Sequence, residues 1–160
     1  AIDRMERQAW PTVQSQFFLL PIPLLKGYLL HLQGNSAEAR SNFEEARGIL
    51  EEALIESPGD DRLHSALGIA YAGLGRAEEA IQEGVRGLTL MPPENEANKG
   101  VYRMEDLAQI YAMVGEDETA LEVVGELLRL PGTYSVRMLE VDPRFAHLRE
   151  QDRFQELVGS

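Results

Sequence analysis

Apolar residues recur at three- and four-residue spacing along most of the chain, which is the pattern of amphipathic helices. The clearest stripe, over about residues 36–57, contains Phe43, Ala46, Ile49, Leu50, Ala53 and Leu54. The same spacing predicts further helices over about 1–10, 23–33, 61–74, 77–90, 95–114 and 117–130. Prolines and glycines separate these segments, and a proline inside a helix removes a backbone hydrogen bond. The pattern therefore predicts an all-α protein.

Three similar turn signatures divide the helical region into units. They are Gly34-Asn-Ser-Ala-Glu-Ala39, Gly75-Arg-Ala-Glu-Glu-Ala80 and Gly115-Glu-Asp-Glu-Thr-Ala120. The three glycines are 41 and 40 residues apart. Glycine adopts the left-handed conformation at which helices often end. Each signature therefore predicts a chain reversal between two antiparallel helices.

These boundaries predict five segments. Residues 1–20 form an N-terminal helical segment, which is either a cap or a truncated preceding repeat. Three repeats follow at 21–58, 59–93 and 94–131, and two capping helices at 132–160 end the chain. In the last segment an Arg-Phe pair recurs, and the predicted apolar side contains Phe145, Leu148, Phe154 and Leu157. Because the ends of a helical stack expose apolar surface, a cap over the last pair is expected.

The middle unit matches the consensus of a known helical repeat in both order and spacing. The matching residues are Leu67, Gly68, Tyr71, Gly75, Ala80 and Pro92. The first unit keeps Gly27, Gly34, Ala39, Phe43 and Ala46, and the third keeps Leu107, Ala108, Tyr111, Gly115, Ala120 and Pro131. Over about residues 21–131 the chain thus resembles the tetratricopeptide repeat family. The resemblance implies a right-handed α-solenoid of antiparallel helix pairs.

The chain departs from that family in two ways. Gly84 stands where an aromatic residue is usual and Gly87 where alanine is usual, and we expect close helix packing to explain both glycines. The period of 40–41 residues exceeds the ~34 of the family and also fits HEAT-like pairs. The Gly-to-Ala turn spacing favours the tetratricopeptide interpretation. The tail resembles the segment that follows such repeats in some bacterial multidomain regulators, which implies a C-terminal module of a larger signalling or regulatory protein.

Composition argues against several functions. The net charge is −12, and such a surface repels a phosphate backbone, so nucleic acid is not an expected partner. The chain has no cysteine and no apolar run long enough to cross a membrane. Its histidines, His31, His64 and His147, lie in different units without metal-ligand spacing. We therefore expect no catalytic site, cofactor or metal, and a cytoplasmic location, or a periplasmic one if a transmembrane segment precedes the chain.

The resemblance implies a protein-interaction scaffold that binds a peptide or a partner helix in a concave groove. If the first helices of the units line this groove, the exposed positions on them are Tyr28, His31, Arg62, Ser65, Ile69, Tyr102, Glu105, Gln109 and Met113. In one subgroup of the family, basic and asparagine side chains hold a peptide carboxylate. The matching positions here are Leu24, Tyr28, Ala66, Tyr102 and Asp106, so that mode is not expected. The alternative function is a homodimer formed through the apolar N-terminal segment at Phe17 and Phe18.

Overall fold

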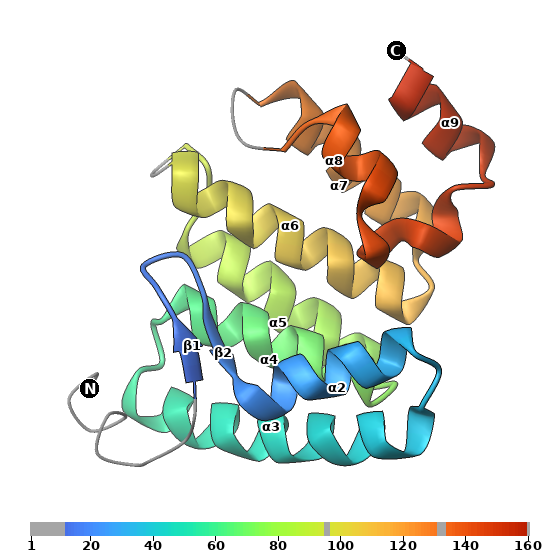
Figure 1. Ribbon diagram of the computed structural model, residues 1–160. Coiled ribbons are helices and arrows are strands. Elements are labelled where there is room, and N and C mark those ends of the chain that lie inside the picture. Colours follow the sequence, from blue (N-terminus) through green and yellow to red (C-terminus); the bar gives the residue numbers. More distant parts are fainter. Residues whose placement is uncertain (1–11, 95–96, 131–133, 160) are drawn as a thin grey trace.

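The computed structural model describes residues 12–94, 97–130 and 134–159, and it is built almost entirely of helices. Three helix pairs follow one another: α2 (Ile22–Leu32) with α3 (Ser36–Glu56), α4 (Asp61–Gly73) with α5 (Ala77–Leu90), and α6 (Ala97–Val114) with α7 (Asp117–Arg129). The tail adds α8 (Val136–Val141), the 3-10 helix η1 (Pro143–Leu148) and α9 (Asp152–Gly159). In Figure 1 the pairs are stacked in chain order, with the tail beyond the last pair. The all-α prediction is confirmed.

The three predicted reversals share one backbone geometry. Gly34, Gly75 and Gly115 have φ values of 76°, 76° and 85°, and no other described residue has a positive φ. In each turn the residue after the glycine donates its N–H to the carbonyl five residues back, as Arg76 does to Tyr71 at 2.9 Å. Each glycine donates to the carbonyl three residues back. This is the Schellman ending of a helix, which requires glycine at the left-handed position.

The N-terminal segment differs from the prediction. Residues 12–21, which we expected to be helical or to lead into a helix, form an antiparallel hairpin of β1 (Thr12–Gln14) and β2 (Leu19–Pro21). Its turn is closed by the Ser15 hydroxyl, which accepts the Phe17 N–H at 3.0 Å. Pro21 has an extended backbone and directly precedes α2, so the helix begins only at Ile22. Residues 1–11 lie outside the described residues.

Glycines let neighbouring helices approach closely. A Cβ added at Gly68 of α4 would lie 2.6 Å from Cδ1 of Ile110 in α6 and 2.9 Å from the carbonyl oxygen of Ala80 in α5. A Cβ at Gly84 would meet the same Ile110 atom at 2.7 Å. At Gly87 it would lie 2.6 Å from Oγ of Ser65. The expected reason for Gly84 and Gly87 is therefore observed, and α4 is fixed closely against α5 and α6.

Two apolar clusters form the interior. One joins α2 to α5 with Ile110 of α6, and the fully buried Phe43 ring lies in it between Gly27 and Gly73. The other joins α6 and α7 to the tail. Phe145, Leu148 and Phe154 of the tail belong to this second cluster and are at most 2% exposed. The tail thus packs its apolar side onto the last helix pair.

Candidate peptide-binding groove

The first helices of the three pairs, α2, α4 and α6, share one side of the stack, and α4 contacts both of the others. A cavity of about 230 Å³ lies on this side. Its lining residues are Phe18, Leu20, Leu24, Leu25, Tyr28, Ile69, Tyr102, Arg103, Glu105, Asp106, Gln109 and Arg144. We call this cavity the first-helix groove. It combines an apolar wall from β2 and α2 with a charged wall from α6 and η1.

The structure brings five of the nine sequence-predicted groove residues to this cavity. They are Tyr28, Ile69, Tyr102, Glu105 and Gln109. Burial is the first cause of the raised pKa of Tyr28, which reaches about 12 although the nearby positive charge of Arg144 lowers it. The Tyr28 phenol therefore stays protonated at neutral pH and can donate a hydrogen bond into the groove.

The other four residues lie elsewhere. His31 is exposed at the end of α2, with its ring stacked 6.3 Å from that of Tyr28. Met113 packs on the first apolar cluster, and its sulfur accepts a hydrogen bond from Gln109. Ser65 is 1% exposed and lies against α5 at Gly87. Arg62 pairs with Asp60, the N-cap of α4, at 2.6 Å, so its first role is local.

Arg103 of α6 is a groove residue that sequence reasoning missed. Only 1% of its side chain is exposed, and its guanidinium pairs with Asp61 of α4 at 3.3 Å and with Asp106 at 3.1 Å. Burial raises the pKa of Asp106, although the positive charge of Arg103 lowers it. A signal was available, because Arg103 precedes the buried Leu107 by four residues and Ile110 by seven. A charged residue on a buried stripe indicates a partner from another helix.

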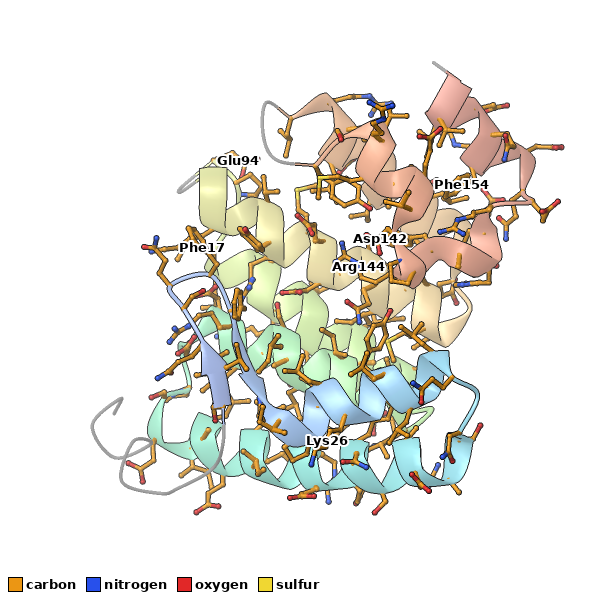
Figure 2. All side chains as sticks on the ribbon, in the orientation of Figure 1. Phe17, Lys26, Glu94, Asp142, Arg144 and Phe154 are labelled. Atoms are coloured by element: carbon orange, nitrogen blue, oxygen red, sulfur yellow. The ribbon has the colours of Figure 1, made fainter. Side chains whose placement is uncertain are left out.

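Arg144 of η1 is the second missed residue. Its guanidinium joins Asp142 at 2.6 Å to Glu105 of α6 at 3.1 Å, and the Tyr134 hydroxyl donates to Asp142 at 2.9 Å. Figure 2 labels Asp142 and Arg144 beside α6. Burial raises the pKa of Glu105, and the charge of Arg144 offsets this only in part. The tail therefore supplies one charged end of the groove, which no local pattern in the sequence indicates.

The hairpin lies over the same side of the stack. The Phe17 ring, labelled at the hairpin tip in Figure 2, stacks on Tyr102 with centroids 4.9 Å apart. Arg62 Nη1 donates to the Ser15 carbonyl at 2.8 Å, and Arg103 donates to the Phe17 carbonyl. Phe17 and Phe18, the residues of the expected dimer contact, are half-buried against the chain itself.

The described residues contain neither a metal site nor a membrane-spanning helix. Within residues 12–94, 97–130 and 134–159, no three His, Cys, Asp or Glu side chains gather as a metal site would require. His64 instead pairs with Glu83 at 2.6 Å, and His147 lies 3.5 Å from Asp117. In the same part of the chain, no helix combines the length and apolar character needed to cross a bilayer.

Stacked antiparallel helix pairs with repeated glycine turns define a helical-repeat protein. The tetratricopeptide repeat family model matches residues 21–92, which include the first two helix pairs. Over these residues the chain is similar to the tetratricopeptide repeat family. Neither the curated proteins nor the solved structures yielded a match to the chain. Tetratricopeptide repeats are in general protein–protein interaction modules and are typically non-catalytic scaffolds.

Proposed function

We propose that this protein is an interaction scaffold whose partner inserts side chains of a peptide or helix into the first-helix groove. The observation that carries the proposal is the cavity itself, where Tyr28, Tyr102 and Gln109 from two first helices meet. Aromatic side chains beside a few oriented polar groups are typical of binding sites. The family assignment supports a protein as the partner.

The net charge of the chain, −12, favours a basic partner. Within the groove itself Glu105 and Asp106 are each paired with an arginine, so this preference comes from the chain as a whole. Long-range attraction speeds encounter with a basic partner, and this effect falls as salt is added. We also infer that the chain acts as a module of a larger bacterial regulatory protein, which the resemblance of its tail supports.

The test uses peptides selected from a random library displayed on phage and panned against the full chain. Selected peptides are titrated calorimetrically against the unchanged chain, Tyr28→Ala and Leu29→Ala. Truncating a central aromatic contact costs about 2 kcal/mol or more, so we expect roughly thirty-fold weaker binding by Tyr28→Ala. Leu29 is the matched control, since it is the next residue of α2, is 58% exposed and does not line the groove.

The two variants give opposite expectations. Leu29→Ala should bind the selected peptides as the unchanged chain does. If Tyr28→Ala binds the selected peptides as tightly as the unchanged chain does, and circular dichroism shows that its helical content is retained, the first-helix groove is not the binding site. Selection that yields no peptide in repeated rounds would count against the interaction function as a whole.

A further inference from the structure

The turn of the hairpin lies on its neighbours as a bound peptide would. The carbonyls of Ser15 and Phe17, two residues apart, accept hydrogen bonds from Arg62 of α4 and Arg103 of α6. The Phe17 ring stacks on Tyr102 at an interplanar angle of 25°. Two of these three contacts involve only the backbone of residues 15–17. The helices therefore contact two backbone carbonyls of the turn and one aromatic ring, and little else of residues 15–17.

The receiving residues do not depend on the hairpin for their positions. Asp60 holds Arg62 through Nε at 3.0 Å and through Nη2 at 2.6 Å. Asp61 and Asp106 hold Arg103 from two helices. Because Asp60 caps α4, and Asp61 and Asp106 lie in α4 and α6, we expect both guanidinium groups to keep their place when the hairpin leaves. Preorganised donors of this kind bind a ligand at a lower entropic cost.

The hairpin, by contrast, is a weakly held element. Its strands have three residue pairs, from Thr12 with Pro21 to Gln14 with Leu19, and two-stranded hairpins of this size are marginally stable in water. Phe17 is half-buried, and Gln16 beside it is exposed. The firmly buried anchor is Leu19, which is 2% exposed, at the far side of the turn. Residues 12–18 can therefore leave the helices while Leu19 stays in the core.

We propose that Arg62, Arg103 and Tyr102 form a site for a turn-forming peptide segment that carries an aromatic residue, and that residues 15–17 of the chain occupy this site until such a partner displaces them. The inference rests on the proposed function and adds to it the form of the partner and an autoinhibitory contact. Tyr102 also lines the first-helix groove, so the site and the groove are continuous. Only molecules whose hairpin is undocked can bind the partner. The observed affinity is therefore the affinity of the open site multiplied by the fraction of molecules that are undocked.

The experiment uses a fluorescent peptide with the sequence of residues 12–20 as the probe, titrated by anisotropy into the full chain. Phe17→Ala removes the ring that covers Tyr102, so we expect this variant to bind the probe at least ten-fold more tightly than the unchanged chain. Adding Tyr102→Ala to it should abolish the gain. Val13→Ala is the matched control, because Val13 is a 43% exposed residue of the same hairpin. A probe with alanine at the Phe17 position should bind weakly to every variant.

A second measurement needs no variant. Saturating probe should speed hydrogen exchange at the Ser15 amide, which donates to the Phe18 carbonyl at 2.8 Å in the docked hairpin. Unchanged exchange under bound probe would overturn the proposal, as would equal probe binding by a folded Phe17→Ala variant. A dimer of the unchanged chain in light scattering that Tyr102→Ala dissociates would also overturn it, because the occupant would then be a second copy.

Failure of this inference is distinguishable from failure of the proposed function. If phage-selected peptides bind the unchanged chain and Phe17→Ala equally and depend on Tyr28, the scaffold function stands and the autoinhibitory contact does not exist. If no selected peptide binds any variant, the proposed function itself fails.

Discussion

Gly68→Ala tests whether close packing of α4 holds the first-helix face together. Gly68 is the glycine of the Leu-Gly pair in the middle repeat, and it lies where α4 meets both α5 and α6. A new Cβ would lie 2.6 Å from Ile110 Cδ1, 2.9 Å from the Ala80 carbonyl oxygen and 3.1 Å from the Gly84 nitrogen. Optimal carbon–carbon contacts are about 3.5–4.0 Å, so the first approach is about 1 Å too short.

The size of the effect follows from two opposing terms. Ala is favoured over Gly in a helix interior by about 1 kcal/mol. Overpacking a core costs about 1–3 kcal/mol, and the upper half of that range applies because two of the three atoms belong to the backbone of α5 and cannot rotate away. The expected net loss in the free energy of unfolding is therefore roughly 1–2 kcal/mol.

Gly48→Ala is the matched control. Gly48 lies inside α3, and a Cβ there would meet no atom within 4 Å, so the same substitution should stabilise the chain by about 0.5–1 kcal/mol. Thermal unfolding followed by circular dichroism should place the Gly68→Ala midpoint about 2–8 °C below that of the unchanged chain, with Gly48→Ala above it. If Gly68→Ala is as stable as Gly48→Ala, α4 and α5 are not held by this contact.

Two further expectations concern the turns and the tail. Gly75→Ala should lower the free energy of unfolding, measured by urea titration, by about 1–2 kcal/mol. The reason is that φ at this position is 76°, so the backbone of a residue with a side chain is strained there even though the added Cβ would meet no atom within 4 Å. An unchanged free energy of unfolding would contradict the Schellman geometry. Burial disfavours the charged form of Asp142, but the hydrogen bonds and charge of Arg144 outweigh burial and hold the pKa of this carboxyl below its usual range. The unfolded state therefore binds more protons than the folded state below about pH 5, and the stability from Asp142 is lost as the pH falls from there through its folded pKa. The stability difference between the unchanged chain and Asp142→Asn should shrink as urea titrations move to lower pH, and a pH-independent difference would contradict the assigned pairing.

The groove was predictable in part. The helical period and the family resemblance identified the first helices as the lining, and five of the nine chosen positions line one cavity. Ser65 was misassigned because the period places it on the side of α4 away from the obvious stripe, whereas Gly87 leaves room there for a close contact with α5. Because Gly87 lies on another helix and has no side chain, α5 can approach Ser65 closely. The apolar spacing within α4 gives no sign of this contact.

The amino-acid sequence by itself determined the three helix pairs, their reversals and the resemblance to the repeat family. These depend on near neighbours: apolar spacing within one helix, and a left-handed glycine that only its own turn requires. The tertiary structure decided which charges meet and where the hairpin lies. Arg103 reaches Asp61 across 42 residues and the Phe17 carbonyl across 86, and Arg144 reaches Glu105 across 39. Such contacts arise only after the helices have packed, because packing sets the distances between segments remote in sequence, and the hairpin appears only at that level.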